Sequence, residues 1–117
     1  MNRHPVFNDI PPAGSTRFLY AGPFTVDLQT RHVVLDDEFV PLPACAFDCL
    51  VTLLRHSPEP VSYKTLAAES KKGKLTELDA QDLTRMLVYM LRKAVEPDIQ
   101  KPRYIISVPG YGYRVDI

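Results

Sequence analysis

Five polar side chains late in the sequence recur at spacings of three and four, the repeat of one helical face. They are Asp82, Arg85, Tyr89, Arg92 and Lys93. Guanidinium and ammonium groups in such a row donate hydrogen bonds to anionic oxygens, and an arginine can also pair with two acceptors on one base edge. On the sequence alone the pattern fits binding of a polyanion and a solvated helix face equally well.

The sequence shows no arrangement of residues that is typical of a catalytic or metal-binding site. Cys45 and Cys49 sit four apart in an apolar stretch, so we expect two small buried hydrophobic side chains there. The sequence has no glycine-rich phosphate loop and no nucleophile motif. The carboxylates of Asp36-Asp37-Glu38 are better explained by a β-turn than by acid–base catalysis. We therefore expect a protein that is not an enzyme, with no catalytic residue, no metal and no cofactor.

The composition is that of one small globular domain. The chain has 117 residues, of which 45% are apolar and 24% are charged. No apolar run approaches the roughly 20 residues of a membrane span, and the N-terminus lacks the apolar region of a secretory signal. We therefore expect a cytoplasmic protein without a membrane segment. The formal net charge is zero, but residues 1–60 carry −3 and residues 61–117 carry +3.

The elements that position the polar face are read from periodicity and turn residues. Residues 1–16 are rich in proline and are expected to be a flexible tail or linker. Short β-prone runs separated by turn residues predict a four-stranded antiparallel sheet. These runs are 17–20, 24–27, 31–35 and 39–41.

Three helices are expected next, at 43–56, 63–70 and about 77–95. Ser62 resembles an N-cap for the second helix, and Thr76 opens a capping box for the third. Val61 is expected to be a short buried link before the second helix. The inward face of the third helix should supply core residues, which are Leu83, Leu87, Val88, Leu91 and Val95.

The C-terminal segment 103–117 predicts a β-hairpin around a Pro109-Gly110 turn. Gly110 and Gly112 are both expected to supply positive φ at this turn. Tyr111 should lie exposed at the tip, whereas Tyr104 and Tyr113 should pack against the sheet. The predicted fold class is therefore α+β, a winged helix-turn-helix with an N-terminal four-stranded antiparallel sheet, three helices and a C-terminal hairpin wing.

This order, together with its residues, resembles the winged-helix DNA-binding domain of OmpR/PhoB-type response regulators from about Phe18 to Val115. The wing also looks like that of ToxR/CadC-like regulators. The matching stretches are Gly22-Pro23-Phe24-x-Val26-Asp27-Leu28, Val40-x-Leu42, Phe47-x-x-Leu50, Val61-Ser62-x-x-x-Leu66, Leu91-Arg92-Lys93-Ala94-Val95 and Tyr104-Ile105-x-Ser107-Val108-x-Gly110-x-Gly112-Tyr113-Arg114.

The resemblance implies that residues 17–117 form the DNA-binding effector domain of a transcriptional regulator in two-component (phosphorelay) signalling. The third helix would enter the major groove of double-stranded DNA, and the wing at 103–116 would touch the backbone or the minor groove. The implied DNA-binding residues are Asp82, Arg85, Met86, Tyr89, Arg92, Lys93, Ser107 and Tyr111. A homodimer on DNA is a further expectation. The basic loop of Lys71, Lys72 and Lys74 would contact RNA polymerase.

Roles can be assigned to the helix residues by their chemistry. Arg85 could pair with a guanine edge, and Asp82 could accept from a cytosine amino group or hold Arg85 in position. Tyr89 could bond a phosphate or pack on a thymine methyl group. Arg92 and Lys93 are better placed to neutralise phosphates.

Departures from the family pattern leave a second interpretation open. Tyr89 and Met90 stand where basic residues are common in the family, and Leu87 replaces a common polar residue. With three or four phosphates neutralised, the slope of log K against log salt should be about −3 to −4. The alternative is a degenerate winged helix that acts as a protein–protein interaction module, because exposed methionine and tyrosine also favour protein contacts.

Overall fold

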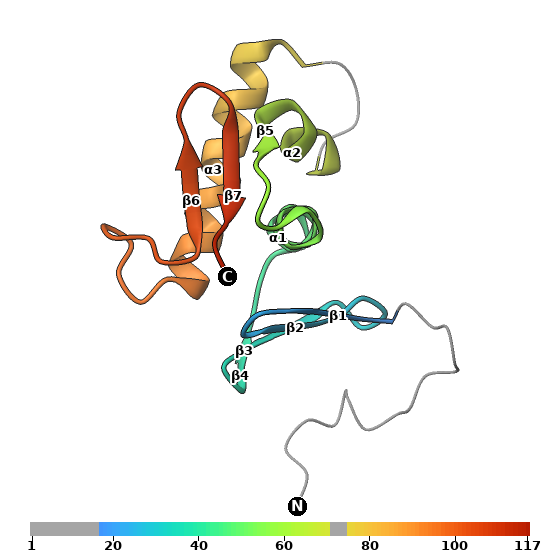
Figure 1. The fold of residues 1–117 in the computed structure, drawn as a ribbon. Coiled ribbons are helices and arrows are strands. Elements are labelled where there is room, and N and C mark those ends of the chain that lie inside the picture. Colours follow the sequence, from blue (N-terminus) through green and yellow to red (C-terminus); the bar gives the residue numbers. More distant parts are fainter. Residues whose placement is uncertain (1–16, 71–74) are drawn as a thin grey trace, which may run out of the picture. The chain divides into compact units, whose positions relative to one another are not determined.

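The computed structural model describes residues 17–70 and 75–117. The chain forms two compact units, and the boundary between them along the sequence falls between Pro41 and Leu42. The first unit contains the strands β1 (Phe18–Ala21), β2 (Phe24–Asp27), β3 (His32–Leu35) and β4 (Glu38–Val40). The second contains α1 (Ala44–His56), β5 (Val61–Ser62), α2 (Tyr63–Ser70), α3 (Glu77–Val95), β6 (Ile105–Val108) and β7 (Gly112–Val115), as Figure 1 shows. The predicted sheet, three helices and C-terminal hairpin are confirmed.

The first unit is an antiparallel sheet in the strand order β1-β2-β3-β4. Val26 lies opposite Val33, and Val33 lies opposite Val40, so one row of buried valines crosses three strands. Asp36 and Asp37 join β3 to β4 with φ of 50° and 68°. Aspartate tolerates this left-handed conformation better than most residues, and the carboxylate cluster is therefore a tight hairpin turn, as the sequence predicted.

A buried carboxylate anchors the entry to this sheet. Asp27 is fully buried and accepts from Arg17 Nε at 3.1 Å and from Arg17 Nη2 at 2.9 Å. Its Oδ1 also accepts from the backbone N–H groups of Gln29 and Thr30. Burial alone would raise the pKa of this carboxyl group, but the hydrogen bonds from Arg17, Thr30 and Gln29 outweigh burial and lower that pKa.

In the second unit, α3 packs against both α1 and α2, and α1 also contacts β7. The inward face of α3 contains Leu87, Val88, Leu91 and Val95, all buried as predicted, whereas Leu83 is only half-buried. Facing residues of the other elements complete this core. They are Leu50, Leu53, Leu66, Ala67, Ile105 and Val115.

A short strand, β5, corrects the expectation of a simple link at Val61. Val61 pairs with Tyr113 and Ser62 with Gly112, which gives a three-stranded sheet in the order β5-β7-β6. The expected role of Gly112 is also corrected. Its φ is not positive, and a Cβ atom there would lie 1.8 Å from the Val61 carbonyl oxygen. Glycine is thus required at 112 by close approach, whereas Gly110, with φ of +76°, serves the turn as predicted.

Candidate nucleic-acid interface

The interface is built on α3, whose ends are fixed by local signals. Thr76 is the N-cap, and its Oγ1 accepts from the Asp79 N–H at 3.0 Å. Arg92 and Lys93 lie in the last turn, where positive charge complements the helix dipole. The helix ends at Val95, directly before Glu96 and Pro97. The expected bounds of 77–95 and the first half of the capping box are confirmed.

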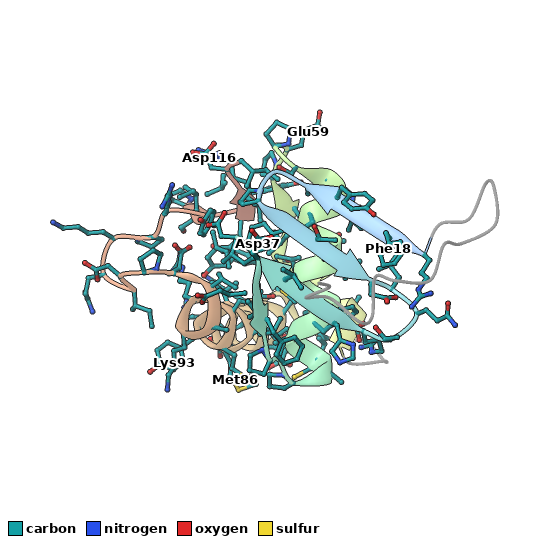
Figure 2. The ribbon with its side chains drawn as sticks, turned by 90° about the horizontal axis from the view of Figure 1, so that it is seen from below. Phe18, Asp37, Glu59, Met86, Lys93 and Asp116 are labelled. Carbon is teal, nitrogen blue, oxygen red and sulfur yellow. The ribbon has the colours of Figure 1, made fainter. Side chains whose placement is uncertain are left out.

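One strip of α3 faces away from the core. Its members, called the outer strip below, are Asp82, Arg85, Met86, Tyr89 and Lys93, and all five are exposed. Met86 is 53% exposed and Tyr89 is 55% exposed, which is high for side chains of their size. Figure 2 shows Met86 and Lys93 on the same side of α3. Five of the six expected helix residues therefore share one face.

Contacts within the outer strip are weak. Arg85 Nη1 lies 3.4 Å from Asp82 Oδ1, with both side chains more than 60% exposed. Lys93 Nζ lies 5.5 Å from the centroid of the Tyr89 ring. Exposed pairs of this kind contribute little to stability, so both cations can turn toward a ligand at small cost.

Arg92, the sixth expected residue, is turned toward the wing. Its side chain is half-buried, and its guanidinium donates to the Ile105 carbonyl oxygen from Nη2 at 2.8 Å and from Nε at 3.3 Å. The same group lies 5.6 Å from the centroid of the Tyr113 ring. Burial raises the pKa of the Tyr113 phenol, and the positive charge of Arg92 offsets part of that rise. Arg92 thus joins the last turn of α3 to both strands of the hairpin.

Glu96 makes a second set of hydrogen bonds that connect the end of α3 to the wing. Its side chain is buried, and its carboxylate accepts from three consecutive backbone N–H groups. The distances are 2.6 Å from Arg103, 3.0 Å from Tyr104 and 2.8 Å from Ile105. Bonds to a carboxylate are stronger than neutral ones, so Glu96 fixes where β6 begins. No local sequence motif marks this role of Glu96, because the N–H donors lie seven to nine residues away.

The wing carries the two remaining expected residues on its surface. Ser107 and Tyr111 are both exposed, and Tyr111 lies in the turn, where its N–H donates to Val108 O at 3.0 Å. The carbonyl oxygen of Tyr111 accepts from the Tyr63 N–H at 3.0 Å, which ties the tip to the start of α2. Tyr104 and Tyr113 are buried, as predicted.

The two helices of the helix-turn-helix are joined by a hydroxyl group that sequence reasoning missed. Thr84 is fully buried on α3, and its Oγ1 donates to the Tyr63 carbonyl oxygen at 3.0 Å. A threonine at a core position of an amphipathic helix is the signal that could have indicated such a bond, because a buried hydroxyl needs a partner. Thr84 fixes how α2 meets α3.

Two sets of expected residues lie outside the described part of the chain. They are the tail at 1–16 and the basic loop with Lys71, Lys72 and Lys74. Within residues 17–70 and 75–117, no group of three His, Cys, Asp or Glu side chains could hold a metal ion. Cys49 is buried and Cys45 is half-buried, and burial raises the pKa of the Cys49 thiol to about 12. Cys49 is therefore an unreactive core side chain at neutral pH.

Within residues 17–70 and 75–117, no helix combines the length and apolar character that a membrane crossing needs.

Comparisons with known sequences point to one family. The family model described as "Transcriptional regulatory protein, C terminal" matches residues 37–115. The DNA-binding response regulator MtrA of Mycolicibacterium smegmatis is 30% identical over 107 residues, which cover 92% of this chain and 45% of that protein. The transcriptional regulatory protein PhoP of Escherichia coli K12 is 30% identical over 96 residues, which cover 81% and 41% respectively. This chain thus spans less than half of these relatives.

Solved structures share the fold. The RstA DNA-binding domain of Klebsiella pneumoniae in complex with the RstA box superposes with a TM-score of 0.74 at 24% identity, over 85% of this chain and 96% of that chain. The DNA-binding domain of CpxR from E. coli gives a TM-score of 0.69 at 22% identity, over 84% and 94%. At these identities the likeness concerns the fold alone.

Proposed function

Because residues 37–115 place this chain in the family of transcriptional regulatory protein C-terminal domains, we propose that it is the double-stranded DNA-binding domain of a transcriptional regulator. In this proposal α3 enters the major groove, and the hairpin of β6 and β7 lies on the backbone or in the adjacent minor groove. No catalytic step is part of the proposed function.

One observation carries the proposal. The face of α3 that turns away from the core holds the outer strip, and the wing is fixed to the end of the same helix by Arg92 and Glu96. A helix with an open polar face and a hairpin held rigidly beside it is suited to contact a groove and its edge together. A solvated helix face would not need the wing to be fixed in this way.

The outer strip suggests a division of roles. Arg85 is the candidate for a bidentate pair with guanine, and Asp82 holds its guanidinium or accepts from a cytosine amino group. Lys93 neutralises a phosphate, and Ser107 of the wing bonds another. Tyr111 at the tip contacts the backbone or the minor groove. Arg92 instead acts through the wing, because its guanidinium is already bonded to Ile105.

The whole protein is proposed to act in two-component signalling as a response regulator. Support comes from MtrA, a DNA-binding response regulator that is more than twice as long as the segment that it shares with this chain. A homodimer on DNA would compensate for the small number of cations on α3. RNA polymerase is the proposed partner of Lys71, Lys72 and Lys74.

Binding to random-sequence duplex DNA at low and moderate salt tests this function. We expect retention at low salt and a slope of log K against log salt of about −3 to −4. Lys93→Ala should weaken binding to all sequences alike and reduce the slope by about one unit. Arg55→Ala is the matched control, because Arg55 is an exposed cation on α1, outside the outer strip and the wing.

Two results would count against the proposal. No retention at low salt would exclude DNA binding and favour the second candidate, a protein-interaction module. That candidate is motivated by Leu78, Met86 and Tyr89, three of the seven large apolar or aromatic side chains that are exposed among the described residues, because all three lie on α3. A slope that Lys93→Ala leaves unchanged would remove Lys93 from the phosphate contacts.

A further inference from the structure

The middle of the outer strip is apolar. Met86 and Tyr89 are neighbours on α3 at a spacing of three residues, with Asp82 and Arg85 before them and Lys93 after them. Both side chains are more than half exposed. The Met86 thioether and the faces of the Tyr89 ring offer large apolar contact surfaces, and only the Tyr89 hydroxyl is a strong hydrogen-bonding group. This central pair therefore needs an apolar group on the ligand.

The charge of this face does not favour a contact made of phosphates alone. The exposed charged residues from the start of α3 through the outer strip are Glu77, Asp79, Asp82, Arg85 and Lys93, with three negative charges against two positive ones. Phosphate binding follows the number of cations that neutralise it. The sequence-dependent part of the contact must come from the base edges that the strip meets.

Only one base presents an apolar group in the major groove, and that group is the C5-methyl of thymine. We propose that Met86 and Tyr89 recognise thymine methyl groups, so that the preferred duplex has thymine at the positions facing the middle of α3. The inference rests on the proposed function, and it specifies the chemistry of the ligand. Arg85 would read one guanine next to these thymines.

A protein partner is the competing ligand for exposed methionine and tyrosine. Duplex DNA is favoured for two reasons. The chain belongs to a family of transcriptional regulatory domains, and cations lie on both sides of the apolar pair. A protein partner is retained as an outcome of the experiment.

The experiment removes the methyl group and nothing else. A bound site is first selected from a random duplex pool with the full chain, and each thymidine is then replaced singly by deoxyuridine, which pairs in the same way. We expect at least one central position at which the replacement weakens binding about fourfold, the value for one buried methyl group. Positions outside the α3 contact should be unaffected.

Variants then assign the effect to its residue. Met86→Ala and Met86→Gln should each lose the discrimination between thymidine and deoxyuridine at the position that Met86 contacts, because neither keeps the thioether end. Tyr89→Ala should lose it at the position that Tyr89 contacts. The exposure of Met86 and Tyr89 makes these variants compatible with folding. Met90→Ala is the matched control, since Met90 lies on α3 but outside the outer strip, and it should keep the discrimination.

The failures can be told apart. Tight binding that ignores every deoxyuridine replacement would overturn methyl recognition and leave the proposed function intact. Discrimination that survives in both Met86 variants and in Tyr89→Ala would remove these residues from the contact. Absence of any DNA binding at low salt would overturn both proposals and direct the search to a protein partner.

Discussion

The guanidinium group of Arg92 donates to the main-chain carbonyl oxygen of Ile105, 13 residues further along the chain, at 2.8 Å and 3.3 Å. This pair joins the helix that would read DNA to the strand that begins the wing. The ring of Tyr113 on the other wing strand lies beside the same cation. The angle between α3 and the wing is therefore set by a side chain whose charge does not point to solvent, although its sequence pattern indicated a phosphate contact.

Replacing Arg92 by methionine should destabilise the wing without changing the salt slope of DNA binding. The Ile105 carbonyl would lose a charged donor, and bonds of that kind contribute about 1.5–3 kcal/mol to the free energy of unfolding. Urea denaturation measures the loss, and a salt titration measures the slope. A slope that falls by a full unit, as expected for Lys93→Ala, would show that Arg92 neutralises a phosphate instead.

Glu96→Gln should lower the free energy of unfolding by about 1–3 kcal/mol. The amide keeps one acceptor oxygen, but its NH₂ group would face one of the three N–H donors that the carboxylate now satisfies. Urea denaturation of the variant provides the measurement. Glu59→Gln is the control, because that side chain is exposed, and it should change stability by less than about 0.5 kcal/mol. Equal stabilities for both variants would contradict the bracing role of Glu96.

The helices and turns were predictable because their signals are local. Thr76 and Pro97 delimit α3, and the spacing of Arg85, Tyr89 and Lys93 correctly placed them on its outward face. The roles of Arg92 and Glu96 were not predictable, because each depends on backbone atoms brought close only by the folded wing. Periodicity shows which face a residue occupies, but it does not show when a long side chain at the edge of that face turns inward.

Gly112→Ala should lower the free energy of unfolding far more than Gly110→Ala, although both glycines lie in the same hairpin. A Cβ atom at 112 would meet the Val61 carbonyl group at 1.8 Å, so β5 would have to separate from β7. A Cβ atom at 110 meets nothing within 4 Å, and only the positive φ is strained, at about 1–2 kcal/mol. Thermal unfolding of the two variants tests this order. A Gly112→Ala protein as stable as Gly110→Ala would show that β5 does not pair as described.

Acid should loosen the N-terminal sheet through Asp27. The pKa of this carboxyl group is lowered in the folded state, so its contribution to stability is fully present above its ordinary value of 3.8 and is lost as the pH falls through the lower folded value. NMR resonances of Val26 and Val33 can follow the sheet from pH 6 to pH 2. Asp27→Asn should be less stable at neutral pH and should lose this part of the pH dependence. An unchanged acid transition in Asp27→Asn would assign it to another group.

Arg85 provides the sharpest distinction between reading a base and neutralising charge. If its guanidinium pairs with one guanine, Arg85→Ala should cost about 1–3 kcal/mol on the selected site and relax the preference at a single base pair. Its exposed contact with Asp82 contributes little to folding, so stability should hardly change. Competition between the selected site and its single-base variants measures both effects. A uniform loss on all sequences would make Arg85 a phosphate contact, and binding equal to that of the parent on every sequence would remove it from the interface.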